Sequence, residues 1–291
     1  MFSYYKSLND QEQRLIEFKD DDTSLLQKII QLNLINNSRK KYRAAPVQLD
    51  ILACRLANRT SREAAENGYT SHWNLEGETP YQRYASVGGV DHISENAFGQ
   101  RTNKTYEINA ESVKKLMREG HLSFMAERKP HDGHKLNIIN KYHNFVGIGF
   151  YLTDKQFNYY EEFIDRYLTF ENIPQEVLPK KGFTIRVIVP EGKYLYFVSV
   201  GMDNFPKPMS SAVLNRTGNY DDFGSRNILN IKPWELSMMR SNLKYDLNFN
   251  FSKSGLYYVQ LFLSDKEMTH EGSYNTTGKI QASGLVIPVM Q

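Results

Sequence analysis

Residues 134–149, which read HKLNIINKYHNFVGIG, contain the pattern on which the fold prediction depends. His134 opens a short apolar run, and a second, glycine-spaced run extends from Phe145 to Leu152. The second run has the length and apolar character of a buried strand, so we predict a strand there. His134 is then a candidate site residue, provided that the rest of the chain folds around it.

Three more residues of related chemistry lie upstream, namely His72, Glu95 and Glu119. Imidazole and carboxylate groups that act together can bind a divalent metal ion or move protons. These residues and His134 are widely spaced in the sequence, so they can act together only if the fold gathers them. The elements between them therefore have to be predicted first.

The first part of the chain shows mainly helical patterns. Thr23 offers a helix cap, and Pro46 disfavours helical backbone in the residue before it, so one helix should end between them. We predict helices at 23–43, 46–67, 79–85 and 110–125, and a strand at 157–168 that pairs with the strand at 145–152. These elements place His72 on a loop, Glu95 on an extended segment and Glu119 within the fourth helix.

The pattern changes near Pro174, and from Phe183 onward apolar residues alternate with polar ones. Such alternation is typical of strands with one buried face. We predict strands at 183–189, 194–200, 245–251, 256–263 and 284–289. Lys253-Ser254-Gly255 predicts a hairpin between the third and fourth of them. The sequence therefore predicts an α+β chain with a polar extension at 1–22, an α/β domain at 23–172 and an all-β domain, a β-sandwich, at 180–291.

Composition narrows the classes of function. The chain has 291 residues and a formal net charge of only +3, which argues against nucleic acid as a partner. The basic run at 38–43 is interpreted as a solvated helix end. Cys54 is the only cysteine, so no intrachain disulfide can form, and its apolar surroundings predict a place in the core. No stretch is apolar enough to span a membrane, and the first seven residues lack the core of a signal peptide, so we expect either a cytoplasmic protein or a removed signal.

Six motifs of the first domain occur in the order found in one known family. They are LINNSR at 34–39, LDILACRLA at 49–57, YTSH at 69–72, GETPYQR at 77–83, SEN at 94–96, and HKLNII with VGIG within 134–149. Over about residues 25–170 the chain therefore resembles the CAP superfamily, also called SCP-like, which includes cysteine-rich secretory, antigen 5 and pathogenesis-related proteins. Because it lacks their cysteines, it resembles the disulfide-free bacterial-type branch, and venom, sperm or defence roles are not implied.

The resemblance implies an α-β-α sandwich with a cleft that carries two histidines and two glutamates. Position by position, these are His72, Glu95, Glu119 and His134. Glu119 departs from the pattern of the family, because the family has an aromatic pair before this acid and the chain has Leu-Met-Arg. The remaining histidines of the first domain are interpreted as surface or loop groups: His92, His121, His131 and His143.

Two classes of function remain open. In the first, the cleft is a binding site in which neutral His72 and His134 hold Zn²⁺ or a similar ion, while Glu95 and Glu119 raise the pKa of the imidazoles. The adjacent cleft would hold a lipid or a peptide, or bind a surface glycan or protein. The alternative is a metal-assisted hydrolase, a peptidase or esterase, in which Glu95 or Glu119 acts as the base.

The sequence favours binding over catalysis. It has no His-Glu-x-x-His motif and no Gly-x-Ser-x-Gly nucleophile elbow, and its only thiol is expected in the core. A purely structural cell-surface module is a third possibility that fits the appended β domain. The resemblance implies an extracellular, periplasmic or cell-surface location, although no signal peptide is visible.

Overall fold

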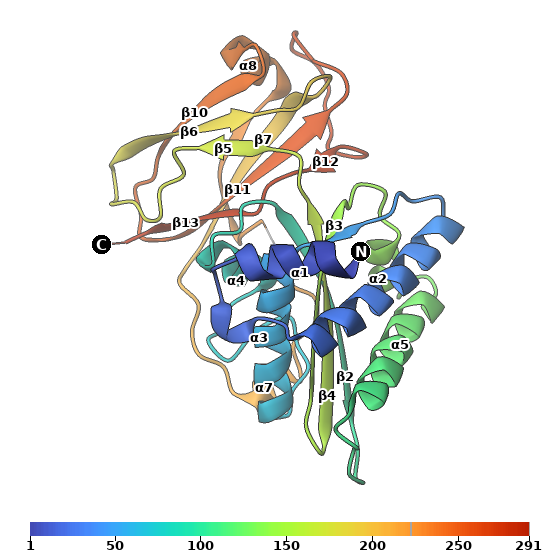
Figure 1. Cartoon of the computed structure of the whole chain (residues 1–291). Coiled ribbons are helices and arrows are strands. Elements are labelled where there is room, and N and C mark those ends of the chain that lie inside the picture. Colours follow the sequence, from blue (N-terminus) through green and yellow to red (C-terminus); the bar gives the residue numbers. More distant parts are fainter. Residues whose placement is uncertain (222, 291) are drawn as a thin grey trace. The chain divides into compact units, whose positions relative to one another are not determined.

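The computed structural model describes residues 1–221 and 223–290, which fold into two units drawn from interleaved parts of the chain (Figure 1). The first unit contains Met1–Val87, Ile93–Ile164 and Lys207–Tyr220. The second contains Gly88–His92, Asp165–Pro206 and the described residues from Asp221 onward. The predicted domains, 23–172 and 180–291, are each one continuous range, whereas these units exchange residues 88–92 and 207–220.

Side-chain caps mark the start of the long helices in the first unit. Its helices are α1 (Phe2–Gln11), α2 (Asp22–Lys41), α3 (Ile51–Asn67), α4 (Pro80–Ser86), α5 (Ala110–Ala126), α6 (Gly133–Ile138) and α7 (Ser211–Leu214), with a 3-10 turn at Ile16–Phe18. Asp21 accepts a hydrogen bond from the Ser24 N–H at the start of α2, and Asp50 accepts one from the Ala53 N–H at the start of α3. The helix that was predicted from residue 46 therefore begins at residue 51. No helix in the described ranges is long and apolar enough to cross a membrane.

A four-stranded sheet has helices on both of its faces. Its strands, in spatial order, are β1 (Gln48–Leu49), β3 (Phe145–Leu152), β4 (Gln156–Asp165) and β2 (His92–Arg101), with β1 parallel and β4 antiparallel to β3. α3 packs on one face, where Gly147 and Gly149 let β3 approach Ala53 and Ala57 closely. α2 and α5 cover the other face (Figure 1). This arrangement is the expected α-β-α sandwich, and the predicted strand at 145–152 is confirmed.

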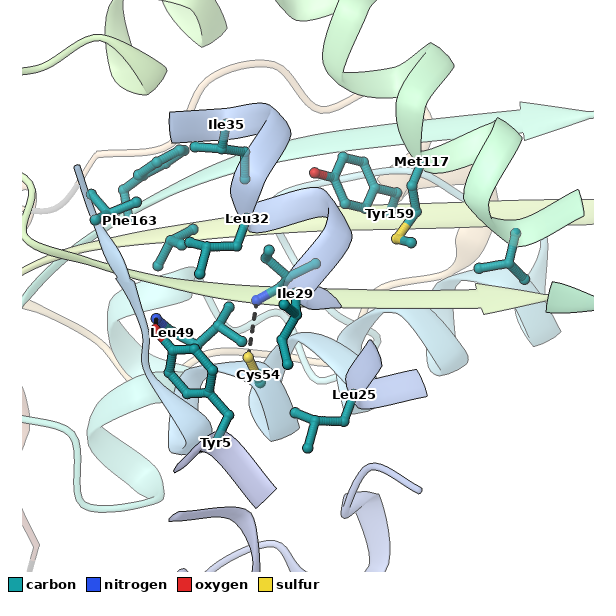
Figure 2. Close-up of a cluster of buried hydrophobic side chains, with 14 of the residues drawn as sticks. Tyr5, Leu25, Ile29, Leu32, Ile35, Leu49, Cys54, Met117, Tyr159 and Phe163 are labelled. Carbon is teal, nitrogen blue, oxygen red and sulfur yellow. Dashed lines mark hydrogen bonds between the residues drawn. The ribbon is translucent and has the colours of Figure 1, made fainter. Parts of the chain in front are cut away.

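The larger hydrophobic core of this unit lies between α2, α5 and the sheet (Figure 2). It contains Leu25, Ile29, Leu32 and Ile35 of α2, Leu116, Met117 and Phe124 of α5, and Phe157, Tyr159 and Phe163 of β4. Cys54 joins it from α3, and its Sγ accepts a hydrogen bond from the Ile148 N–H at 3.3 Å. Burial raises the pKa of the Cys54 thiol to about 12, so the expected core position is confirmed and a thiolate nucleophile is disfavoured.

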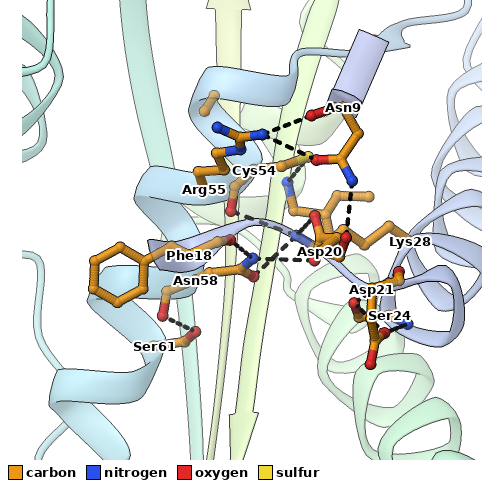
Figure 3. Close-up of polar contacts among 12 residues, drawn as sticks. Asn9, Phe18, Asp20, Asp21, Ser24, Lys28, Cys54, Arg55, Asn58 and Ser61 are labelled. Carbon is orange, nitrogen blue, oxygen red and sulfur yellow. Dashed lines mark hydrogen bonds and ion pairs between the residues drawn. The ribbon is translucent and has the colours of Figure 1, made fainter. Parts of the chain in front are cut away.

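Residues 1–22 are an ordered part of the first unit rather than the predicted polar extension. α1 buries Tyr5 against the core. Arg55 of α3 donates hydrogen bonds to the backbone oxygens of Asn9 and Arg14, each at 2.6 Å, and Figure 3 shows the contact with Asn9. The backbone of this segment is thus hydrogen-bonded to α3.

A buried ion pair fixes α2 to the same segment (Figure 3) and leads to a prediction. Lys28 Nζ lies 2.7 Å from Asp20 Oδ2, and both side chains are almost fully buried. Lys28→Met should leave the Asp20 carboxylate buried without its cation and lower the free energy of unfolding by about 3 kcal/mol, as measured by urea denaturation. Lys28→Met/Asp20→Asn removes both charges and should recover much of the loss. Equal losses in the two variants would contradict this explanation.

Two antiparallel sheets form the second unit. One contains β5 (Thr169–Glu171), β6 (Gly182–Ile188), β10 (Lys244–Asn250) and β9 (Arg240–Ser241). The other contains β12 (Ile280–Gln281), β11 (Gly255–Ser264), β7 (Tyr194–Asp203) and β8 (Arg226–Ile231), with β13 (Leu285–Val289) also paired to β11 and α8 (Pro233–Met239) after β8. The Tyr245 hydroxyl of one sheet accepts a hydrogen bond from the Leu195 N–H of the other, and the Phe251 and Tyr257 rings stack 3.9 Å apart. The prediction of a β-rich second region is confirmed.

The predicted hairpin between 245–251 and 256–263 is wrong. β10 pairs with β6 and β9, whereas β11 pairs with β7, β12 and β13, so the chain changes sheets between β10 and β11. Lys253-Ser254-Gly255 does make the expected tight connection. A turn signal of this kind does not distinguish a connection within one sheet from a connection between two facing sheets.

Candidate functional site

Two contacts fix His72, one at its side chain and one at its backbone. α3 ends at Gly68 in the left-handed conformation, and the loop that follows carries His72. The His72 Nδ1 lies 2.8 Å from Glu95 Oε1 on β2. Arg83 of α4 donates a hydrogen bond of 2.6 Å to the His72 backbone oxygen. Side chain and backbone are therefore both fixed, and 15% of the side chain remains exposed.

The imidazole of His72 is neutral at physiological pH. Burial and, after it, the positive charge of Arg83 lower the pKa of His72 to about 4. The pKa was expected to be raised by Glu95 and Glu119, but the loss of hydration dominates, and among the acids only Glu162 opposes it. A neutral imidazole whose Nδ1 faces a carboxylate carries its proton there, so the Nε2 of His72 keeps a free lone pair.

A second buried acid, Glu162 of β4, lies against Glu95. Neither side chain has any exposed surface, and no N–H group in the described ranges donates to the oxygens of Glu162. Burial and the neighbouring Glu95 raise the pKa of Glu162 well above its usual value, while burial raises the pKa of Glu95 against the opposing charge of Arg83. We therefore interpret Glu162 as a neutral acid that lies beside an ionised Glu95, whose charge Arg83 balances.

His134 is oriented by a carboxylate in the same way as His72, but the acid, Glu127, was not predicted as a site residue. Its Nδ1 lies 2.5 Å from Glu127 Oε1, and the other oxygen of Glu127 accepts hydrogen bonds from the backbone N–H groups of His134 and Lys135. The ring stacks on Phe124 with 4.7 Å between centroids. Glu127 directly follows α5 and precedes His134 by seven residues, but nothing in the local pattern marks it.

The two histidines face one cavity of about 420 Å³. The centroids of their rings are 6.5 Å apart, with 30° between the ring planes. The cavity is lined by His72, Ser94, Glu95, Asn96, Glu127, Pro130, His131, Gly133, His134, Asn137, Asn219 and Tyr220. The structure thus brings three of the four predicted residues, His72, Glu95 and His134, to one place.

Glu119, the fourth predicted residue, lies outside this cavity. Its side chain is 44% exposed on α5, and its carboxylate is 3.9 Å from Lys115, one helical turn earlier. The buried face of α5 is formed by other positions, among them Leu116, Gly120 and Phe124. Glu119 is therefore a surface residue of the helix, and Glu127 is the acid that contacts the second histidine.

Three of the four histidines that were interpreted as surface or loop groups are buried: His92, His121 and His143. His131 alone is exposed, at the rim of the cavity. His121 is fully enclosed and bonds Glu161 Oε1 through Nδ1 and Ser38 Oγ through Nε2, each at 2.9 Å. A histidine can be buried when both ring nitrogens find partners, and these partners come from β4 and α2, far away in the sequence.

A polar network links this buried histidine to the wall of the cavity. Asn96 Nδ2 donates to Glu161 Oε2 at 3.1 Å and to the His134 backbone oxygen at 3.2 Å. Asn137 Nδ2 in turn donates to Asn96 Oδ1 at 2.9 Å. The SEN motif therefore supplies two residues with different tasks, since Glu95 orients His72 while Asn96 holds the backbone at His134.

Arg39 corrects the interpretation of 38–43 as a solvated helix end. Its side chain is fully buried. The guanidinium donates to the backbone oxygens of Ile138, Asn140 and His143 at 2.7, 3.0 and 3.0 Å. Arg39 thereby fixes the segment that connects α6, and with it His134, to β3.

Asn219 and Tyr220 also line the cavity, although they come from the segment between β7 and β8 and were not predicted as site residues. The Tyr220 hydroxyl accepts a hydrogen bond from the Glu95 N–H at 3.0 Å, and its ring lies 5.0 Å from that of His72. The segment was assigned to the β domain, and nothing in its composition indicated that it would contribute to this site.

Comparisons with known proteins found one family match and several similar solved structures. Residues 32–164 match CAP, the cysteine-rich secretory protein family. No curated protein matches the chain. Similar solved structures include an extracellular protein containing an SCP domain from Bacillus anthracis, with 21% identity over 47% of this chain and 39% of that one and a TM-score of 0.36. An outer surface protein from Borrelia burgdorferi matches with 20% identity over 48% of this chain and 92% of that one, with a TM-score of 0.39.

A cysteine-rich secretory protein from Staphylococcus aureus matches with 14% identity over 48% of this chain and 39% of that one, with a TM-score of 0.32. The chain thus covers about two fifths of the length of the first and third of these structures. Its only cysteine is free and buried in the core. The match to the CAP family covers residues 32–164, which is less than half of the chain, and it coincides with the α-β-α sandwich, so this segment is similar to a CAP domain without disulfides.

Proposed function

We propose that the CAP-like domain is a binding module whose cavity takes a divalent metal ion such as Zn²⁺ at the Nε2 atoms of His72 and His134. One observation carries the proposal: the Nδ1 of each imidazole faces a carboxylate, at 2.8 Å for Glu95 and 2.5 Å for Glu127. Carboxylates orient the imidazoles of metal sites in this way, and they leave Nε2 to the metal. Neither Nε2 has a hydrogen-bond partner among the residues that the structure describes.

The two histidines fit a metal site in which the protein supplies only some of the ligands. Within residues 1–221 and 223–290, no three His, Cys, Asp or Glu side chains form a group that could hold a metal ion. His72 and His134 would then be the two protein ligands, and solvent or a bound ligand would supply the remaining positions of a tetrahedral ion. A metal ion bound there would act as a Lewis acid that attracts oxygen donors of the ligand.

The positions of the acids support binding rather than metal-assisted hydrolysis. The two oxygens of Glu95 face His72 and Arg83. Those of Glu127 accept hydrogen bonds at the start of α6, and Glu119 lies outside the cavity. A general base needs a carboxylate that can reach the attacking water, and both acids that line the cavity, Glu95 and Glu127, already have partners.

The walls of the cavity favour a polar ligand, and we propose a peptide segment. Ser94, Asn96 and Asn137 line the cavity with a hydroxyl and two amides that are held in place by hydrogen bonds to one another. Because the family is named for secreted proteins, we also propose that this protein acts outside the cell or at its surface.

Calorimetric titration with Zn²⁺ at neutral pH tests the proposal. His72→Ala and His134→Ala should each weaken binding by more than about tenfold, since even partners behind a ligand change affinity by that much. The double variant should not bind. His270→Ala, which removes an exposed histidine of the other unit, is the matched control and should bind like the wild type. Wild-type affinity in the double variant would refute the metal site.

A further inference from the structure

Residues Lys207–Tyr220, which we call the strap, lie outside the matched CAP segment but belong to the first unit. α7 of the strap lies beside α3 (Figure 1). Leu214 of α7 is fully buried in a cluster with Ala57, Ala64 and Tyr160. The strap therefore contributes to the core of the CAP-like domain, although the chain on both sides of it belongs to the β-rich unit.

Polar contacts tie the strap to the loop that carries His72. They join Met209 N to Leu75 O at 2.7 Å, Thr70 N to Asn215 Oδ1 at 3.1 Å, and Ser71 Oγ to Thr217 Oγ1 at 2.6 Å. The loop also makes room for the strap, because a Cβ atom on Gly77 would lie only 2.2 Å from the backbone oxygen of Lys207. Loop and strap are thus fitted to each other on both sides of His72.

Tyr220, the last residue of the strap, contacts both members of the His72–Glu95 pair. Its ring centroid is 5.0 Å from that of His72, with 55° between the planes, and Trp73 meets it edge-on at 6.5 Å. Its hydroxyl accepts a hydrogen bond from the Glu95 N–H at 3.0 Å. The ring is therefore placed from two directions, by the anchors of the strap and by β2.

We propose that Tyr220 is a positioning residue of the cavity: its ring covers one side of the His72 imidazole and restricts the approach of ligands to Nε2. The residues that shape this site then extend beyond the matched segment, because the sequence between two strands of the β-rich unit supplies one wall. An effect of Tyr220 on metal binding at Nε2 rests on the proposed function. The shielding of His72 by the ring does not, because it concerns the metal-free protein.

The rate at which diethyl pyrocarbonate acylates each histidine tests this shielding, because the reagent attacks unprotonated imidazole nitrogens. The full-length, metal-free protein is treated briefly, and modification at His72 and His134 is measured by peptide mass spectrometry. Tyr220→Ala should accelerate modification of His72 several-fold and leave His134 unchanged. Tyr220→Phe keeps the ring, which the anchors of the strap still hold, and should react much more like the wild type than Tyr220→Ala does. Asn215→Ala loosens the strap at a distance and should also accelerate His72.

An unchanged rate at His72 in Tyr220→Ala would overturn the proposal, and so would an equal acceleration at His134, which would show that the ring does not act on His72 in particular. A repeat with Zn²⁺ separates the two proposals. Protection of both histidines by Zn²⁺ supports the metal site, and its absence refutes that site without changing the comparison between the Tyr220 variants.

Discussion

Gly149→Ala should destabilise the first unit by on the order of 4 kcal/mol, as measured by urea unfolding followed by circular dichroism. A Cβ atom at this position of β3 would lie 2.1 Å from the carbonyl carbon and 2.3 Å from the carbonyl oxygen of Ala57 in α3. Overpacking usually costs less, because a crowded side chain can rotate away. Here the crowded atoms belong to helix backbone, so the helix and the strand must separate.

The same geometry supplies the controls. Ala57→Gly should not rescue Gly149→Ala, because two of the three nearest atoms are backbone atoms that remain in place. Gly133→Ala, where a new Cβ would meet nothing within 4 Å, should stay within about 0.5 kcal/mol of the wild type. A Gly149→Ala protein that unfolds at the same urea concentration as the wild type would show that α3 and β3 can move apart without loss.

This close contact also explains why the fold of the first unit could be predicted. The alternation of glycine with valine and isoleucine at 146–149 is a local signal for a strand against which a helix packs closely. Local sequence patterns also indicated the helices, and the predicted bounds of α5 agree with the structure to within one residue. The start of α3 was missed by five residues because Asp50 caps it, and the preceding two residues pair as β1 with β3.

The features that were not predicted depend on partners distant in sequence. The turn after β10 has the residues of a hairpin, yet its two strands join different sheets, because β10 pairs with β6 and β11 pairs with β7, and both partners lie far away in the sequence. The strap contains only one short helix, α7, and buries a single large apolar residue, Leu214. Neither periodicity nor composition could indicate that this segment leaves the β-rich unit.

In the candidate site, the motifs located His72, Glu95 and His134, whereas the partners of these residues came only from the structure. Glu119 could have been doubted from the sequence, since it lies beside the apolar stripe of α5 rather than on it. Glu127 gave no such signal, because it stands after the helix in an irregular segment. Glu161 and Glu162 are adjacent acids in the strand that was predicted at 157–168. The burial of both was unexpected, because ionised carboxylates are costly to bury.

Arg83→Met should have the other large effect. Arg83 is 1% exposed and donates to the backbone oxygens of His72 and Glu78, at 2.6 and 2.9 Å, and to the Glu95 carboxylate. Methionine keeps much of the aliphatic length but leaves the Glu95 charge buried without a cation, which costs about 3–5 kcal/mol. Each orphaned carbonyl adds about 1–3 kcal/mol, so the total loss should be at least about 5 kcal/mol at neutral pH, as measured by urea unfolding.

The loss in Arg83→Met should shrink in acid. Burial raises the pKa of Glu95 and of Glu162, and the charge of Arg83 opposes both shifts, so removing it raises both values further. A carboxyl group whose pKa is raised by folding does not reduce the free energy of unfolding at a pH where it is protonated in both the folded and the unfolded state. Its cost begins near the unfolded pKa, about 4.3 for glutamate, and grows until the pH passes the folded pKa. Urea unfolding at about pH 4 should therefore show a smaller difference from the wild type than at neutral pH.

Arg83→Met/Glu95→Gln separates the two tasks of this pair. The double variant no longer carries the buried Glu95 charge, so it should regain several kcal/mol at neutral pH and lose most of the pH dependence of the single variant. It still lacks the guanidinium on the His72 backbone and the carboxylate on its Nδ1. If the double variant regains stability but binds Zn²⁺ with lower affinity than the wild type, Arg83 and Glu95 orient His72 in addition to stabilising the fold. A double variant as unstable as Arg83→Met would instead mean that the lost backbone contacts, and not the unbalanced charge, dominate.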